Sequence, residues 1–293
     1  MKTILVPTDF SKISENALAF VLTLAKKFNS EITLLHAYHT LSARPEMSLR
    51  EHEKELKRLK VESDKRMKVL CDDTRRLLQL ECNSICVEGY AKDKIIDSTR
   101  ERNPDLLVMG TENIDPIDKI IFGTVTGKVL KKVKCPLLII PEEASFEEPK
   151  KIAFALDYHD SDLTDIEFLI EMAKKFNAEL HVLRVATSDA DSDFEDRLMK
   201  DFKDRVDQKA HGVDITWHFV HGGNVASALK EFASANSIDL LAAAKTKLNL
   251  LKRLFQGSVT QKLFDQARIP LLIFQARDSD LRSYRMTKAD NYE

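Results

Sequence analysis

A short run of glycine and hydroxyl residues near the end of the first half of the chain has the chemistry of an anion site. Gly123-Thr124-Val125-Thr126 opens a segment that is predicted to be helical. Glycine permits the turn, the free N–H groups at a helix start attract phosphate, and Thr124 and Thr126 add hydroxyl donors. The alternative is purely structural: Gly123 makes the turn and Thr124 caps the helix.

Two familiar phosphate-binding motifs are excluded. The run is not a Walker A motif, because Gly123 to Gly127 is one residue too short and Val129 follows Lys128 where Ser or Thr is required. The first apolar strand segment is not followed by a G-x-G-x-x-G turn, which argues against a nicotinamide-dependent dehydrogenase.

The elements that would position this run occur twice. The sequence Ala25-Lys26-Lys27-Phe28-Asn29 is repeated at 173–177. A second similarity joins Phe122–Thr126 and Gln256–Thr260. The repeat has the size of one ordinary domain, so we interpret the chain as a tandem duplication. We expect two domains and a polar C-terminal tail, with bounds at 1–143, 149–277 and 278–293.

Composition narrows the function classes. The chain has 293 residues, 43% of them hydrophobic and 31% charged, with a net charge of −2. A net charge so close to zero gives no basic surface for binding nucleic acid or an anionic membrane. The sequence contains no membrane-spanning stretch and no signal peptide pattern, so we expect a cytoplasmic protein. The four cysteines form no Cys-x-x-Cys pair, which favours buried apolar residues over a metal site.

Hydrophobic periodicity alternates between strand and helix in both halves. Strands are expected at 3–7, 31–37, 83–88, 105–110 and 136–140, and then at 151–156, 179–185, 215–221, 240–244 and 270–274. Helices are expected at 12–28, 47–80 (highly charged, and either continuous or broken once), 91–103 and 124–132, and then at 163–176, 190–210, 225–236 and 258–266. This order predicts the α/β class: two tandem Rossmann-like doubly wound domains, each with a five-stranded parallel sheet flanked by helices.

Ligands of such sheets bind beyond the carboxyl ends of the strands, where the strand order reverses. Four loops of the first half should meet there: Pro7-Thr8-Asp9, Ala37, Gly110, and the loop that ends at Gly123. Asp9 also has a structural interpretation, since an Asp two residues before Ser11 can help to cap the first helix.

The residues at these positions resemble those of a known family. Ile-Leu-Val-Pro-Thr-Asp-Phe-Ser at 4–11 resembles the opening of universal stress proteins. Gly110, position 113 and Gly123-Thr124 follow the spacing of that family's ATP signature, Gly-x2-Gly-x9-Gly-Ser/Thr, and 108–110 and 135–141 match its pattern as well. One departure is Asn113 in place of glycine, although Asn is the non-glycine residue most tolerant of a left-handed backbone.

The resemblance implies a stress-response regulatory protein that binds ATP in its N-terminal domain, with Mg²⁺ held by the phosphates. Carried over from ATP-binding members, Pro7, Asp9 and Ala37 would contact adenine, Gly110 would lie near ribose, and 123–126 near the phosphates. The implied binding residues are Pro7, Thr8, Asp9, Ala37, Gly110, Asn113, Gly123, Thr124, Val125 and Thr126.

Catalysis is not indicated. We find no efficient hydrolytic base and no metal site, so slow ATP hydrolysis is the most that is expected. Adenylyl transfer is disfavoured because 8–11 lacks the Ser-Gly-Gly phosphate loop of related sheets. The alternative function is a nucleotide-independent scaffold or binding module for a protein or small-molecule partner, which Asn113 and the second half favour.

The second half departs further from the signature. Ala244 and Lys247 stand where both signature glycines should be, and Ala155 replaces Pro7, whereas Asp157 and 257–260 keep the pattern. We therefore expect this half to serve assembly. Members of the family pair the last strands of two domains across a dimer interface, which here implies an intramolecular pseudo-dimer and leaves a further homodimer open.

A charge placed in either last strand tests this pairing. If Leu137–Ile140 pairs with Leu271–Phe274, Ile139→Lys or Ile273→Lys should loosen the two halves or leave an aggregation-prone edge. Size-exclusion chromatography and limited proteolysis of the linker at 141–150 would report the change. Unaltered elution and protease resistance in both variants would contradict the pairing.

Overall fold

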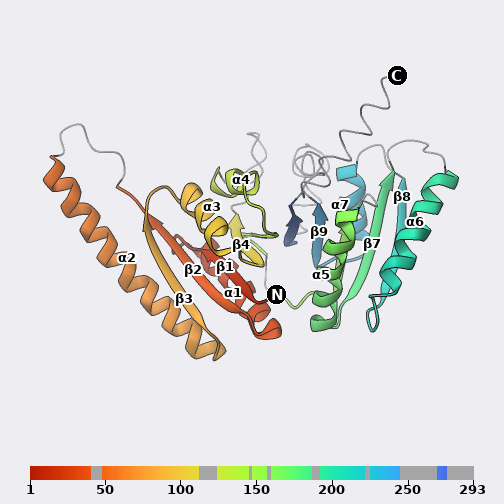
Figure 1. Ribbon diagram of the computed structural model, residues 1–293, viewed down its shortest axis with the longest axis horizontal. Coiled ribbons are helices and arrows are strands. Elements are labelled where there is room, and N and C mark those ends of the chain that lie inside the picture. The colour runs from red at the N-terminus through yellow and green to blue at the C-terminus, as the bar shows by residue number, and fades with distance from the viewer. Residues whose placement is uncertain are drawn as a thin grey trace, which may run out of the picture. The chain divides into compact units, whose positions relative to one another are not determined.

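The computed structural model describes residues 1–40, 48–111, 124–144, 147–156, 160–186, 192–221, 225–244 and 269–275 (Figure 1). The chain forms two compact units, one built mainly from 1–114 and 122–142 and the other from 143–293. Each unit has its own parallel sheet with helices packed on it.

The N-terminal unit alternates strand and helix as expected. Its strand order is β3-β2-β1-β4-β5, and every neighbouring pair is parallel. The helices α1 and α2 contact each other, as do α3 and α4, which is the arrangement that right-handed crossovers give on opposite faces of a sheet. The elements are β1 (Thr3–Pro7), α1 (Lys12–Phe28), β2 (Glu31–Tyr38), α2 (Leu49–Leu78), β3 (Cys82–Glu88), α3 (Ala91–Arg102), β4 (Leu106–Thr111), α4 (Thr124–Leu130) and β5 (Leu137–Pro141).

The core of this unit lies in its central strands. Ile4, Leu5 and Val6 of β1 and Leu106 to Val108 of β4 are at most 1% exposed. Helices cover both faces of a parallel sheet, so its central strands are apolar on both sides. The position of the strand-order reversal, between β1 and β4, is thus held rigidly.

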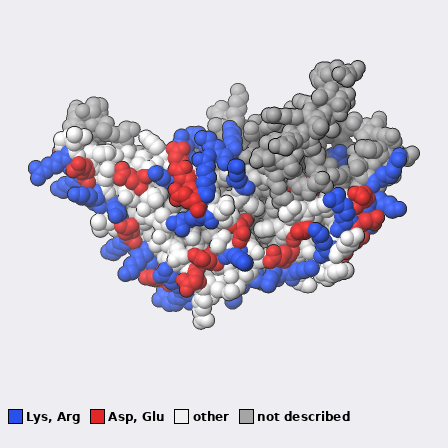
Figure 2. Space-filling view, in the orientation of Figure 1, with Lys and Arg blue, Asp and Glu red and all other residues white. Residues whose placement is uncertain are grey.

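Helix α2 is continuous for 30 residues. Ser48 caps it in a full capping box with Glu51, and Gln79 ends it in a left-handed conformation. Acidic and basic side chains are interspersed on the face seen in Figure 2. Exposed ion pairs such as Arg58–Glu55 and Arg75–Asp72 lie along this helix. Among the described helices, none is both long and apolar enough to span a membrane.

The C-terminal unit repeats this plan. Its strand order is β10-β9-β6-β7-β8, again parallel throughout. The elements are β6 (Lys151–Ala155), α5 (Asp160–Phe176), β7 (Glu179–Ala186), α6 (Ser192–Asp207), β8 (Ile215–His221), α7 (Val225–Ala235), β9 (Leu240–Ala244) and β10 (Leu271–Phe274).

The helix expected at 258–266 and the tail expected at 278–293 lie outside the described residues. Pairing between the last strands of the two units stays a prediction.

The sequence repeat has a backbone explanation. Asn29 and Asn177 end α1 and α5 in the left-handed conformation, with φ of 54° and 52°. Asparagine tolerates this conformation better than most residues, and it lets the next N–H reach back to the helix. Ser30 N donates to Ala25 O and Ala178 N to Ala173 O, both at 2.9 Å. The repeated Ala-Lys-Lys-Phe-Asn segment therefore encodes the same helix stop in both units.

A histidine pair lies inside the C-terminal unit, and the sequence analysis did not identify it. His181 Nδ1 on β7 and His218 Nε2 on β8 are 3.1 Å apart, and the two rings stack with centroids separated by 5.3 Å. Phe232 of α7 packs edge-on against both rings, and Glu179 Oε2 lies 3.3 Å from His181 Nε2. Burial, and then the nearby His181, lower the pKa of His218 below its ordinary value of 6.5.

This shift predicts that the C-terminal unit loses stability in mild acid. Folded His218 takes up its proton at lower pH than the unfolded residue, so the unfolded chain binds more protons just below 6.5. Stability should fall as the pH falls through that range, and His218→Gln should weaken the dependence. The single tryptophan of the chain, Trp217, reports unfolding of this unit by fluorescence. Equal slopes of stability against pH in parent and variant would contradict this assignment.

Candidate functional site

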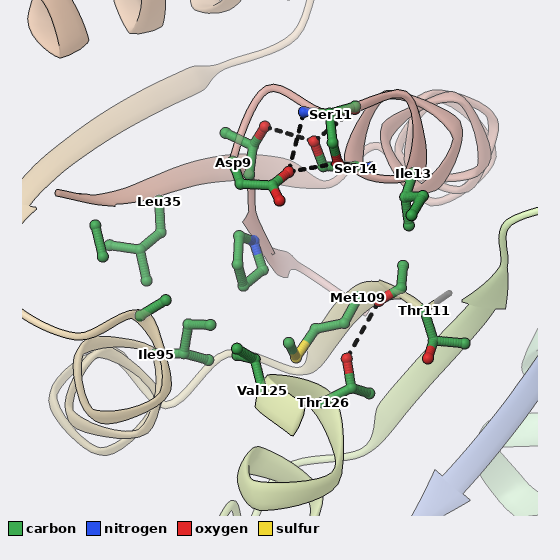
Figure 3. A pocket seen from close by; sticks show the side chains of 15 residues that line it. Asp9, Ser11, Ile13, Ser14, Leu35, Ile95, Met109, Thr111, Val125 and Thr126 are labelled. Atoms are coloured by element: carbon green, nitrogen blue, oxygen red, sulfur yellow. Dashed lines mark hydrogen bonds between the residues drawn. The ribbon is translucent and has the colours of Figure 1, made fainter. Parts of the chain in front are cut away.

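A cavity of about 230 Å³ opens at the carboxyl ends of β1, β2 and β4, where the strand order reverses (Figure 3). It is somewhat smaller than the roughly 300–1,000 Å³ of typical small-molecule sites. Its lining comes from α1, α3 and α4 as well as from the strands. The residues that line it are Pro7, Thr8, Asp9, Ser11, Ile13, Ser14, Leu35, Ala37, Ala91, Ile95, Met109, Gly110, Thr111, Val125 and Thr126.

Seven of the ten expected binding residues meet in this cavity: Pro7, Thr8, Asp9, Ala37, Gly110, Val125 and Thr126. Asn113 and Gly123 lie outside the described residues. Thr124 begins α4, but its side chain is not described. Residues separated by more than a hundred positions thus come together at one edge of one sheet.

Asp9 takes part in capping the first helix, and it also lines the cavity. Its Oδ1 accepts hydrogen bonds from Ser11 N, at 3.0 Å, and from Ser11 Oγ, and Ser11 Oγ in turn caps α1 by accepting from Ser14 N. Burial raises the pKa of the carboxyl, but hydrogen bonds from Ser11 and Ser14 outweigh it and hold the pKa below the usual value. Asp9 is therefore an ionised acceptor, and its other carboxylate oxygen points toward the cavity in Figure 3.

The loop between β1 and α1 is held from several directions. Thr8 Oγ1 lies 3.0 Å from Ser14 Oγ and accepts from Phe10 N. His36 Nδ1 lies 2.8 Å from the Thr8 carbonyl oxygen, which can only accept, so this nitrogen carries the proton. The loop that carries Asp9 is thus fastened both to α1 and to β2.

Phe10 has an unusual backbone, with φ of 62°. The left-handed region is unfavourable for a bulky residue. The ring contacts the His36 ring, at 4.4 Å between centroids, and the Arg66 guanidinium, at 3.9 Å from the centroid. These contacts hold the strained residue in place, and such strain is common beside functional sites.

Gly110 and Thr126 join the two elements at the opposite wall. Thr126 Oγ1 donates to the Gly110 carbonyl oxygen at 3.2 Å, and Thr126 is 4% exposed. A hydroxyl has one hydrogen to donate, so the Thr126 side chain is engaged with β4 rather than available as a donor to a ligand. A Cβ at Gly110 would lie 2.5 Å from Ile13 Cγ2 and 2.7 Å from Ile13 O. Glycine is therefore required here for packing against α1.

Helix α3 provides a wall that the sequence analysis missed. Ala91 and Ile95 lie one turn apart at the start of α3, and Ile95 is 3% exposed. Met109 and Leu35 complete the apolar lining. The i, i+4 spacing of these two apolar residues directly after the third strand places them on one face of a helix, but it does not show that this face turns toward the cavity.

The chemistry of the cavity is that of binding. Apolar side chains form its walls, hydroxyl groups and one ionised carboxylate supply the polar contacts, and no Lys or Arg is among the described lining residues. Within the described residues, no group of His, Cys, Asp and Glu is arranged to hold a metal. Such a site suits a flat apolar group that donates a hydrogen bond to Asp9.

The second unit lacks part of this arrangement. Ala244, at the position of Gly110, is 8% exposed, and Ala155, at the position of Pro7, is fully buried. Asp157, Lys247 and 257–260 lie outside the described residues. A methyl group thus occupies the place where the first unit has only a glycine.

Comparisons with known proteins agree with this architecture. A model of the Universal stress protein family matches residues 1–141 and 148–275. Universal stress protein Slr1230 of Synechocystis sp. is 23% identical, covering 94% of this chain and 100% of that protein. Universal stress protein MJ0531 of Methanocaldococcus jannaschii is 26% identical, covering 51% of this chain and 84% of its own.

The likeness extends to solved structures over nearly the whole chain. The crystal structure of a universal stress protein from Archaeoglobus fulgidus superposes with a TM-score of 0.70, covering 94% of this chain and 97% of that chain. The two sequences are 17% identical, so this likeness establishes the fold alone.

The packing of Gly110 predicts a large effect of a single methyl group. Gly110→Ala would force β4 and α1 apart and should destabilise the N-terminal unit by about 1–3 kcal/mol. Adding Ile13→Ala removes the contact with Cγ2 but not that with the backbone oxygen, so it should restore only part of the loss. Denaturation in guanidinium followed by circular dichroism would measure both. An unchanged midpoint for Gly110→Ala would show that α1 and β4 are not in such close contact.

Proposed function

The chain belongs to the universal stress protein family, and we propose that its N-terminal unit binds an adenine nucleotide, with ATP as the ligand, in the cavity beside Asp9. The observation that carries this proposal is the convergence of Pro7, Asp9, Ala37 and Gly110 with the start of α4 on one cavity. These are the residues that the family resemblance assigns to the nucleotide.

The apolar walls support a purine base as the buried group. Leu35, Ile95 and Met109 are all at most 5% exposed and give the cavity an apolar lining that suits an aromatic ring. The ionised Asp9 accepts hydrogen bonds only, and the exocyclic amine of adenine is a donor. A guanine base in the same orientation would present a carbonyl oxygen in place of that amine, and an ionised carboxylate repels it. This site should therefore favour adenine over guanine.

The phosphates would lie toward Gly123 and the first turn of α4. Because the Thr126 hydroxyl donates to Gly110, its part is to fasten α4 to β4. The backbone N–H groups at the start of α4 would be the donors to phosphate. Mg²⁺ would be held by the phosphates and water, since that ion usually keeps several waters beside substrate phosphates.

The role that fits this site is regulatory binding in the stress response. The described cavity has an acceptor carboxylate already hydrogen-bonded by Ser11 and no general base beside the phosphate end. Any hydrolysis of ATP should therefore be slow. The C-terminal unit, with Ala244 in place of glycine, would contribute assembly through its last strand rather than a second nucleotide site.

Titration calorimetry on the full chain tests nucleotide binding. ATP should bind in the micromolar to millimolar range and GTP much more weakly. Asp9→Asn removes an ionised acceptor and should weaken ATP binding by about 10- to 100-fold, the value of a hydrogen bond to a charged group. Asp97→Asn, an exposed substitution on α3 outside the cavity lining, is the matched control.

The phosphate end is tested separately. Gly123→Val should reduce the affinity for ATP to that for adenosine, because a branched side chain blocks close approach of the backbone. No binding of ATP to folded protein at millimolar concentration would refute the proposal in favour of a nucleotide-independent binding module. If Gly123→Val and the parent bound ATP with equal affinity, Gly123 would serve only as a turn residue.

A further inference from the structure

Two buried thiols of the N-terminal unit are in direct contact. Cys71 of α2 and Cys82 of β3 have their Sγ atoms 3.1 Å apart, and the Cys71 thiol donates to the Cys82 carbonyl oxygen at 2.8 Å. All four cysteines of the chain lie within the described ranges, and these two are the pair whose sulfur atoms meet. Neither lines the cavity beside Asp9.

The position of the pair suits a covalent link. Cys71 is 2% exposed and Cys82 is fully buried, where α2 packs across β3. A disulfide holds its sulfur atoms about 2.0 Å apart, so the two need to approach by only about 1 Å. Cys71 is in the well-packed second half of α2, and Cys82 opens an edge strand of the sheet. A bond between them would tie the longest helix to that edge.

We propose that Cys71 and Cys82 form a reversible intramolecular disulfide, with a hydroperoxide as the oxidant. One thiolate attacks the peroxide, so that an S–O bond forms, the O–O bond breaks and an alcohol, or water from hydrogen peroxide, leaves. The second sulfur then attacks the sulfenic sulfur, the S–S bond forms and water leaves. Two thiols and one hydroperoxide thus give one disulfide, one alcohol and one water.

The surroundings make this a slow reaction. Burial, and then the hydrogen bond and charge of Cys71, raise the pKa of the Cys82 thiol, while nearby Arg75 and Thr74 lower it by less. Since the thiolate is the reactive form, the rate should increase as the pH rises from about 7 to 9. Because the disulfide would form slowly, it would accumulate during sustained oxidation but not during a brief exposure to the oxidant.

The link should stabilise the N-terminal unit. Closing the segment 71–82 restricts the unfolded chain, and the native sulfur atoms are already in contact, so little strain is added. We expect the Tm of this unit to rise by roughly 5–10 °C on oxidation and to return on reduction.

Mass spectrometry of the full chain provides the test. After hydrogen peroxide treatment, denaturation and N-ethylmaleimide labelling, the parent should carry two labels in place of four, and dithiothreitol should restore four. Trypsin leaves Cys82 and Cys86 in one peptide, 77–92, so the variant Cys86→Ser assigns the partner of Cys71. In that variant the peptide 69–75 should still be joined to 77–92.

Two variants serve as controls. Cys71→Ala should retain three free thiols after peroxide and lose the rise in Tm. The double variant Cys86→Ser/Cys135→Ser should still lose both thiols to one bond. Four labels in the oxidised parent, oxidation to sulfinic acid without a link, or a bond that involves Cys86 or Cys135 would each overturn the proposal. None of these results bears on ATP binding, because the pair lies outside the nucleotide cavity.

Discussion

The close approach of α1 to β4 is the constraint on which the N-terminal site depends. Gly110 leaves room for the backbone of Ile13, and any larger residue would push the helix from the sheet. With α1 seated there, its first turn presents Ser11 and Ser14 to the loop that carries Asp9. The Gly110 carbonyl oxygen accepts a hydrogen bond from the Thr126 hydroxyl, which holds α4 at the same edge of the sheet. The backbone around Gly110 thus contacts both α1 and α4, which line the cavity.

The two units share a framework but differ in their site residues. Both use an asparagine helix stop after the first helix, and both hold their first strand through an aspartate: Asp105 Oδ2 accepts from Thr3 N at 3.0 Å, and Asp239 Oδ2 from Lys151 N at 2.9 Å. The framework is therefore shared. The site residues are not, because Ala244 replaces Gly110, and the C-terminal unit has a histidine pair, one member of which is buried, that has no counterpart in the first. Its functional surface would accordingly differ.

Much of the architecture could be predicted from the sequence. The bounds of helix 12–28 and of strands 3–7, 215–221 and 240–244 are predicted to the residue. Ser11 marks the start of the helix, and the strands are apolar or alternating runs. The cavity residues of the strand loops also follow from the rule that ligands bind at the order reversal. The contribution of Ile95 does not, because it depends on how α3 rotates over the sheet. Nor does the engagement of the Thr126 hydroxyl, or the contact of Cys71 with Cys82, since hydrogen bonds across elements leave no periodic signal.

The central claim is that the cavity beside Asp9 holds the adenine base of a nucleotide. Methyl NMR of the full chain during ATP titration tests this most directly, because Ile13, Ile95 and Met109 line the cavity while Leu18 and Val69 line a separate groove between α1 and α2. The account predicts saturable shifts at Ile13, Ile95 and Met109, reproduced by adenosine and absent with GTP. Shifts confined to Leu18 and Val69, or to methyl groups of the C-terminal unit, would contradict it.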